Sequence, residues 1–457
     1  MSSARLVRAT LVLALAAGSA SAQSGAWAIT NARIETVTRG SVERGTIVIR
    51  NGVIEAVGAN VAVPADARIV DATGRTIYPG LFDLTSGLGL PAPARPAGPG
   101  GGGGNPLLAA NAAQNEPQGP FGLEPGRLVA NEIKLTEADI TSARNSGLTA
   151  ILIAPSRGPF RGLSALVPLR GDTATRWIVK SPVALHMGFQ SVQGRYPGSL
   201  LGVIAYQRQA LYDAQRHAQI VERYKANPAG MPRASYDADL DALVPVVKGE
   251  MPIFFAANSE NELRRALAIG GEFKLAVSVV GATEAFRALD ALKGARLSVV
   301  SVDYPNPTQT TGWEYRGAQR VALDDSTTRS AAVQKLLEGN AAALNGAGIR
   351  FALASGGLRP DQFMTNVKKA IAAGLPRATA IEALTIRAAE AAGVEKQLGS
   401  IEVGKIANLV LVEGELLTDA GTIRSVFVDG DQYSVVPVPR PAGATPNGPR
   451  RPPMENR

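Results

Sequence analysis

Residues 79–87 read Pro-Gly-Leu-Phe-Asp-Leu-Thr-Ser-Gly. The apolar run 77–84, which includes most of this stretch, predicts a buried strand. Residues 91–104 come soon after it and contain five consecutive glycines and several prolines. This composition predicts a flexible loop, which we place at 91–125. A buried strand followed by a long loop is the arrangement in which α/β barrels carry their sites.

Downstream of this strand, apolar runs of strand length alternate with helical patterns. Together with 77–84 the candidate strands number about eight, at 149–154, 163–169, 182–186, 252–256, 275–280, 297–302 and 349–354. Apolar strands that alternate with helices predict a parallel sheet covered on its outer side. Helix start signals support the alternation, with a capping box at 259–262 and Pro376 before the helix that runs towards Gly393. We therefore expect an α/β fold, a distorted TIM-like (β/α)8 barrel over 79–396.

The two ends of the chain carry short strands instead. Asn51-Gly52 lies between two apolar runs, which predicts a tight hairpin. Near the other end, residues 407–412 and 425–430 also have the pattern of strands. We expect residues 23–78 and 397–436 to meet in one small β-sandwich.

The outermost segments and the composition limit the class of protein. Residues 1–22 have basic residues, a short apolar core and Ala20-Ser21-Ala22, as in a cleaved signal peptide, and the apolar core is too short to span a membrane. Residues 437–457 are rich in Pro and Arg and predict a disordered tail. The chain has no Cys, which excludes thiolate metal sites. The net charge of +8 comes from scattered residues, so we expect no nucleic-acid partner. The signal peptide and the absence of Cys lead us to expect a periplasmic or secreted location.

Several of these segments resemble the amidohydrolase superfamily. Residues 79–87 are similar to the Pro-Gly-Leu-Ile-Asp-x-His-x-His segment that opens the barrel of that family. Residues 398–409 resemble its closing signature, Gly-Ser-Ile-x-x-Gly-Lys-x-Ala-Asp-Leu. Within the barrel, residues 197–215 are similar to exported, imidazolonepropionase-like amidohydrolases. The resemblance implies the barrel and sandwich architecture and the metal-dependent hydrolysis of non-peptide carbon–nitrogen bonds.

The family holds one or two divalent metals, zinc in many members, at the carboxyl ends of its barrel strands. The positions where it carries metal ligands hold other residues here. We call these the ligand positions: Thr85 and Gly87 on the first strand, Ala256 and Asn258, Gly281, and Gly356, which follows Ser355 on the last strand. No bridging Lys can be placed. The sequence therefore predicts neither a metal nor another cofactor.

A few polar residues keep places near the predicted mouth of the barrel. Asp83 retains its family position, where it is a ligand, a base or, as we favour, a residue that orders the loop. His186 is a residual pocket ligand, a proton-transfer group or, as we favour, a hydrogen-bonded structural histidine. Asp303 either reaches the pocket or begins a loop. An oxygen-only site for Mg²⁺ or Mn²⁺ from Asp83, Thr85, Asn258 and Asp303 has no support in the spacing.

Two further features have ordinary interpretations. His217, the second of the two histidines in the chain, lies in a predicted helix at 203–224, where we expect it on the surface. Gly158 and Gly162 lack the Lys-Ser/Thr that follows the glycines of a phosphate-binding loop, so they predict a flexible loop.

Two functions remain open at this point. The first is a non-catalytic homologue that binds a small molecule or assembles with a second copy or a paralogous amidohydrolase chain. The second is an active hydrolase of cyclic amide or peptide-like substrates with a rearranged site.

Overall fold

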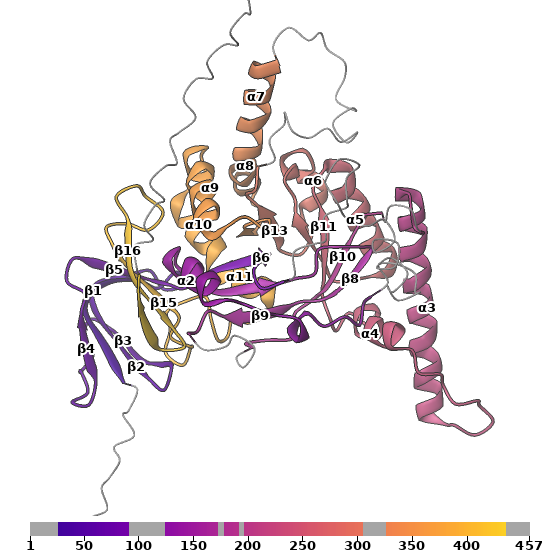
Figure 1. Ribbon diagram of the computed structural model, residues 1–457, viewed down its shortest axis with the longest axis horizontal. Helices are drawn as coiled ribbons and strands as arrows, with labels where there is room; N and C mark the ends of the chain where they lie inside the picture. Colours follow the sequence, from indigo (N-terminus) through magenta and orange to yellow (C-terminus); the bar gives the residue numbers. More distant parts are fainter. Residues whose placement is uncertain (1–25, 91–123, 172–177, 192–195, 305–325, 436–457) are drawn as a thin grey trace, which may run out of the picture.

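A sheet from both chain ends packs beside an α/β barrel in the computed structural model (Figure 1). The structure describes residues 26–90, 124–171, 178–191, 196–304 and 326–435. The predicted signal peptide at 1–22, the glycine-rich part of the predicted loop and the tail at 437–457 lie outside these residues. In the described ranges, no helix is long and apolar enough to cross a membrane.

Strands from the two ends of the chain form one eight-stranded sheet, in which the C-terminal strands lie together on one side and the N-terminal strands on the other. Its order is β17(Asp431–Ser434), β16(Thr422–Val428), β15(Leu409–Glu413), β5(Arg75–Pro79), β1(Trp27–Glu35), β2(Ser41–Arg50) and β3(Val53–Gly58), and β4(Arg68–Asp71) pairs with β1. The indigo and yellow ribbons of Figure 1 lie side by side here. The sheet has its own apolar core, centred on isoleucines of β1 and β2 and on Phe427.

The predicted hairpin of this sheet is present. β2 and β3 are joined at Asn51 and Gly52, whose φ angles of 51° and 79° are both positive. A two-residue turn of this type matches the right-handed twist of the flanking strands, and Asn-Gly is its preferred sequence.

The barrel strands form two sheets. The first has the order β14(Phe351–Ala354), β13(Ser298–Ser301), β12(Val277–Gly281), β11(Ile253–Ala257), β10(Leu185–Gly188) and β8(Phe160–Leu163). The second has the order β6(Leu81–Ser86), β7(Leu148–Ile153) and β9(Ala165–Pro168). β6 also contacts β14, which brings the first and last barrel strands together. The expected TIM-like arrangement is therefore present, with irregular closure.

Two strand predictions were wrong in detail. The run 163–169 is not one parallel strand. Its residues belong to β8 and β9, which run antiparallel to β10 and β7 and separate these two parallel strands. The run 77–84 is divided at Gly80 between β5 of the terminal sheet and β6 of the barrel. Both runs are mostly apolar because they are buried on both faces, so the pattern gave no sign of the breaks.

Helices cover the outer face of the barrel. They are η1(Val129–Asn131), α2(Glu137–Asn145), α3(Leu200–Ala226), α4(Ala238–Val247), α5(Glu260–Phe273), η3(Ala285–Arg287), α6(Leu289–Leu292), α7(Ser326–Glu338), α8(Asn340–Gly346), α9(Pro360–Ala372), α10(Arg377–Leu384) and α11(Ile386–Ala392). Ser259 and Glu262 form the predicted capping box of α5. Pro376 precedes α10 as predicted, but the helix is interrupted at Thr385 before α11 ends at Gly393.

The prediction of a surface position for His217 was wrong. The side chain lies between α3 and α4, is 8% exposed, and its Nε2 is 2.8 Å from Oδ1 of Asp241. The helical pattern alone could not place α4 against that face of α3. Of the two histidines of the chain, His217 is therefore used in helix packing, which leaves His186 as the other.

Gly80 marks the point where the chain passes from one sheet to the other. Its N–H donates to the Asn408 carbonyl in the terminal sheet, while the N–H of the next residue, Leu81, donates to the Gly147 carbonyl beside the barrel. A Cβ at position 80 would lie 2.8 Å from Cβ of the buried Thr149 and closer still to its Oγ1. Only glycine lets the two sheets approach this closely.

We predict that Gly80→Ala lowers the free energy of unfolding by about 2 kcal/mol or more, because the methyl group overpacks the Thr149 site. Gly271→Ala in α5 is the matched control, since a Cβ there meets no described atom within 4 Å. The control should leave stability unchanged or raise it by up to about 1 kcal/mol. Denaturant unfolding checks both, and equal stability of Gly80→Ala and the wild type would contradict the prediction.

Candidate ligand-binding site at the barrel mouth

A cavity of about 490 Å³ opens at the carboxyl ends of the barrel strands. Its lining includes all six ligand positions, namely Thr85, Gly87, Ala256, Asn258, Gly281 and Gly356, as well as His186 and Asp303. Asp83 and Ser355 are not among the lining residues. Polar atoms of Ser86, Ser156, Arg161 and Ser301 are also available along the wall.

The two-residue period of a strand explains why these positions converge. Phe254 of β11 and Val299 of β13 belong to the apolar cluster inside the barrel. Ala256 and Asn258 follow Phe254 at steps of two, and Ser301 and Asp303 follow Val299 in the same way. Residues at i, i+2 and i+4 share one face, so the side chains above the apolar layer face the cavity.

The Asp83 carboxylate connects the first and last barrel strands beneath the cavity. Its Oδ1 accepts hydrogen bonds from the backbone N–H of Thr85, at 3.1 Å, and of Ser355, at 2.9 Å. The side chain is 3% exposed. Burial raises the pKa of Asp83, and the hydrogen bonds from Ser355 and Thr85 oppose that rise. In this geometry Oδ1 of Asp83 accepts backbone hydrogen bonds from the first and last barrel strands, as a structural residue would.

Thr85 is used in the same connection. Its Oγ1 accepts a hydrogen bond of 2.7 Å from the N–H of Gly356, and the Ser355 hydroxyl donates to the Thr85 carbonyl at 3.4 Å. The N–H of Gly357 in turn donates to Ser355 Oγ. Residues 83–85 and 355–357 thus form one hydrogen-bonded unit, which we call the seam.

Three of the ligand positions are glycines, and at two of them, Gly281 and Gly356, the missing side chain leaves space for a neighbouring residue. A Cβ at Gly281 would lie 3.1 Å from Cγ of Asn258 and closer to its Oδ1, and φ at Gly281 is +96°. A Cβ at Gly356 would lie 2.9 Å from Cγ of Asp303, and φ there is +68°. L-residues rarely adopt such backbone angles. Asn258 and Asp303 therefore occupy the volume in which side chains at 281 and 356 would begin.

His186 lies in β10 with its ring against Phe254, 5.4 Å between ring centroids. The residue is 4% exposed, and its Nε2 has no hydrogen-bond partner among the described residues. Burial and, to a smaller extent, the nearby Arg161 charge lower the pKa of His186 to about 3. The imidazole is therefore neutral at physiological pH. The favoured expectation of a hydrogen-bonded structural histidine is not met at this atom.

Asp303 follows β13 and reaches the cavity. Its Oδ1 is buried without a hydrogen-bond partner in the described structure, and burial raises the pKa of its carboxyl group. A buried acceptor without a donor is unfavourable, so this oxygen is available to a donor that enters the cavity.

Arg161 is the site residue that sequence reasoning missed. It belongs to β8 and lines the cavity, with its guanidinium packed against the backbone of Gly188 in β10. The segment around it was interpreted as a flexible loop because Gly158 and Gly162 did not fit a phosphate-binding motif. The available signal was a lone arginine in an otherwise apolar strand that ends at Leu163.

The donor set does not fit the divalent metal that the fold implies. In the described ranges, no group of three or more His, Cys, Asp or Glu side chains lies close enough together to hold a metal ion. A catalytic zinc site needs about three protein ligands, and the cavity wall offers His186 and Asp303. The oxygen-only alternative loses Asp83 and Thr85, which are engaged in the seam.

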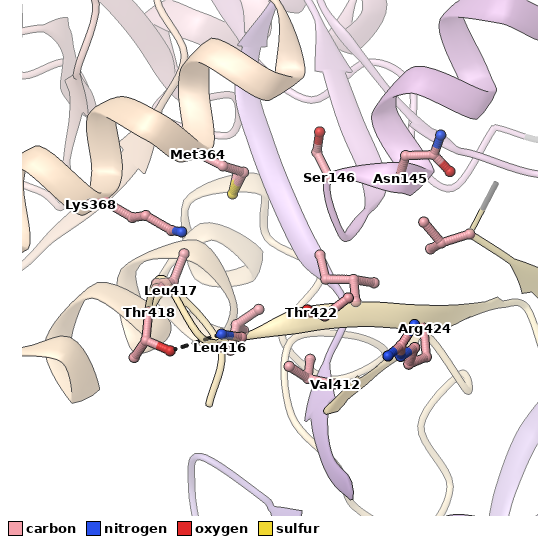
Figure 2. A pocket seen from close by; sticks show the side chains of 13 residues that line it. Asn145, Ser146, Met364, Lys368, Val412, Leu416, Leu417, Thr418, Thr422 and Arg424 are labelled. Carbon is pink, nitrogen blue, oxygen red and sulfur yellow. Dashed lines mark hydrogen bonds between the residues drawn. The ribbon is translucent and has the colours of Figure 1, made fainter. Parts of the chain in front are cut away.

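A second pocket of about 420 Å³ lies between the barrel helices and the terminal sheet (Figure 2). Lys368 and Arg424 are its cations, and each has a carboxylate partner, Asp419 and Glu413 respectively. The remaining labelled side chains are mostly apolar or small, among them Met364, Val412 and Leu416. This pocket is a crevice between packed elements with satisfied charges, so the barrel mouth is the better candidate.

A model of the amidohydrolase family matches residues 206–433. These residues run from α3 through β11–β14 to the closing strands, and the match therefore includes Asn258, Gly281, Asp303 and Gly356. The chain belongs to the amidohydrolase superfamily. Its membership rests on the second half of the barrel and the closing strands, and does not depend on the altered segment at 79–87.

Solved structures of other superfamily members share this fold. An amidohydrolase from Thermotoga maritima superposes with a TM-score of 0.70 at 23% identity, over 89% of this chain and 98% of that one. A Xaa-Pro dipeptidase with methionine bound in its active site gives 0.51 at 17% identity, over 90% and 100%. Molinate hydrolase gives 0.50 at 15% identity, over 93% and 98%. Among curated proteins, no sequence matches the chain.

We predict that Asp83→Ala lowers the free energy of unfolding by about 2–4 kcal/mol, because two buried backbone N–H groups lose their acceptor. Asp419→Ala is the control, since that carboxylate is fully exposed and its ion pair with Lys368 contributes about 0–1 kcal/mol. Chemical denaturation of the two variants checks this. A loss for Asp83→Ala no larger than that for Asp419→Ala would show that the seam contributes little.

We also predict that Gly281→Ala is destabilising by about 2 kcal/mol or more, from backbone strain and contact with Asn258. Adding Asn258→Ala should recover part of this loss, because the contact is removed while the strain stays. A double-mutant cycle in urea measures the coupling. Strict additivity of the two changes would mean that Asn258 does not occupy the space at position 281.

Proposed function

We propose that this member of the amidohydrolase superfamily is a non-hydrolytic protein that binds a small molecule at its barrel mouth. The observation that carries the proposal is that two of the ligand positions are filled by side chains from neighbouring strands while the cavity stays open. Asn258 and Asp303 take the space at Gly281 and Gly356, and Thr85 bonds to the backbone across the seam. The lining that remains has polar groups for binding but too few metal donors for the family reaction.

The chemical consequence follows from how the family activates water. Metal ions lower the pKa of bound water so that hydroxide forms near neutral pH. His186 and Asp303 are the cavity's remaining candidates for that task, and within the described ranges neither His186 Nε2 nor Asp303 Oδ1 has a partner that would orient the group as a base. Binding does not require such a pair, because hydrogen-bond donors and acceptors suffice to fix a ligand.

A hydrolase of cyclic amide or peptide-like substrates with a rearranged site is the second candidate. The observation that favours it is the unpaired, buried Oδ1 of Asp303, since a carboxyl with a raised pKa is suited to proton transfer. It is the weaker candidate because Arg161 and His186 lie on other strands and no described side chain holds Asp303 in a catalytic geometry.

The proposed binding function is compatible with an exported protein and with assembly with a second chain. The residues at 1–22 favour export, so the ligand would be met in the periplasm or outside the cell. A second copy or a paralogous amidohydrolase chain would find exposed apolar side chains on and after α3, including Leu201 at 78% and Tyr236 at 85% exposure. Figure 1 shows α3 at the edge of the barrel, where it extends beyond neighbouring elements.

We predict that the full chain, purified without chelators and incubated with Zn²⁺, Mn²⁺ or Mg²⁺, retains substantially less than one metal ion per chain after desalting. The Thr85→His/Gly87→His variant should also remain free of tightly held zinc, because positions 256, 258, 281 and 356 still lack ligands. Mass spectrometry of metal content checks both. One firmly bound metal per wild-type chain, together with cleavage of an amide substrate, would overturn the proposed function.

A further inference from the structure

Arg161 lies in the cavity and forms no ion pair with a described carboxylate, although the charge of Glu262 opposes the fall in its pKa. Among the described residues, its side chain makes one hydrogen bond, from Nε to the Gly158 carbonyl at 3.3 Å. Arg127 and Arg144, which are also at least partly buried, are by contrast paired with Glu132 and Glu137 respectively. Burial lowers the pKa of Arg161 to about 10, which still leaves the guanidinium charged at neutral pH. A desolvated cation of this kind strongly favours an anion beside it.

The surroundings of Arg161 hold it in that position. A Cβ at Gly188 would lie 2.7 Å from the guanidinium carbon, so the side chain fits only because residue 188 is glycine. Gln207 of α3 donates from Nε2 to the carbonyls of Pro159 and Gly188, at 3.2 and 2.9 Å. These two carbonyls flank the arginine on β8 and β10. Gln207 is fully buried, and it fixes both sides of the arginine's position.

His186 is next to Arg161 and has a ring nitrogen that lacks a hydrogen-bond partner among the described residues. β8 and β10 are paired with Gly162 opposite His186, so the two side chains come from adjacent strands. The neutral imidazole has a buried Nε2 without a partner among the described residues. In the tautomer that carries its proton on Nε2, it donates to the same anion that the guanidinium holds. This wall of the cavity therefore offers two donors to one ligand group.

Asp303 stands on the opposite wall. The sheet order places β10, β11 and β12 between β8, which carries Arg161, and β13, which precedes Asp303. The open Oδ1 of Asp303 requires a donor. One cation and one carboxyl group at opposite sides of a shared cavity are complementary to a ligand with the reverse arrangement of charge.

We propose that the barrel mouth binds a small zwitterion, with its carboxylate held by Arg161 and His186 and its ammonium group directed to Asp303. This inference rests on the proposed non-hydrolytic binding function and names the chemical class of its ligand. It explains together the unpaired guanidinium, the unpaired imidazole nitrogen and the unpaired carboxylate oxygen. A neutral ligand would leave the guanidinium without an anion, and a simple anion would leave Asp303 without a donor.

The test is calorimetric titration of the full chain with β-alanine, γ-aminobutyrate and ε-aminohexanoate. The matching alkanoates, alkanamides and alkylamines of the same lengths are titrated alongside. We expect at least one of the amino acids to bind, its alkanoate to bind more weakly, and its amide and amine more weakly still, by about tenfold or more. An amide that binds as tightly as the acid of equal length would overturn the proposal, whatever the behaviour of any variant.

Arg161→Gln should weaken binding of the preferred amino acid by about tenfold or more, because a charged hydrogen-bond donor is lost. Arg157→Gln is the matched control, with the same change of charge at an exposed position in the same segment, and should stay within about twofold. Asp303→Asn should reduce the preference for the amino acid over the plain alkanoate. Equal weakening by Arg157→Gln and Arg161→Gln would assign the effect to overall charge and refute the site.

Two checks separate folding and the underlying function from this inference. If Arg161→Gln fails to unfold cooperatively, the comparison of acids with amides on the wild-type chain remains decisive. Metal content and amide cleavage are measured on the same preparation. Metal-dependent cleavage would overturn the proposed function, whereas a metal-free chain that binds none of the amino acids would overturn the zwitterion inference alone.

Discussion

The carboxylate of Asp83 is the interaction on which the barrel mouth depends. The first and last barrel strands contact each other, but in the described structure they belong to different hydrogen-bonded sheets. The two strands are joined instead by hydrogen bonds that the backbone N–H groups of Thr85 and Ser355 donate to the buried carboxylate of Asp83. Because a buried backbone donor without a partner is costly, these bonds hold residues 355–357 against β6. The cavity wall formed by Thr85 and Gly356 takes its shape from this seam.

The same region shows how a barrel keeps an open mouth while its ligand positions change. Small residues at 281 and 356 would by themselves leave voids, which packed proteins do not tolerate well. Asn258 and Asp303 fill these volumes from neighbouring strands and bring polar atoms to the wall. The replacements are therefore coupled through space rather than independent. A large side chain at either glycine would require its neighbour, Asn258 or Asp303, to move and the backbone to leave the left-handed region.

The local structure and the general fold could be predicted from the sequence more accurately than the polar contacts of the cavity. Asn51-Gly52 and Ser259 have strong intrinsic preferences, so the hairpin and the start of α5 could be predicted from a few residues. The ligand positions could be aligned because the motifs around them are intact. Arg161 was missed because its role depends on the glycine at 188 and on Gln207, which lie far away in the chain. The burial of His217 by α4 and the reversal of β8 and β9 likewise depend on tertiary neighbours that no local pattern encodes.

The position of β5 in the terminal sheet has a consequence for how the protein is made. β5 pairs with β1 from its own end of the chain and with β15, which is separated from it by nearly the whole barrel. During synthesis, β1, β2 and β3 can pair early, while the edge of β5 that later receives β15 stays open until the barrel sequence has emerged. Such an edge is a template for pairing with other chains, and long-range strand pairing is slow. The nascent chain therefore carries an aggregation hazard at its amino-terminal end that only its carboxyl-terminal strands remove.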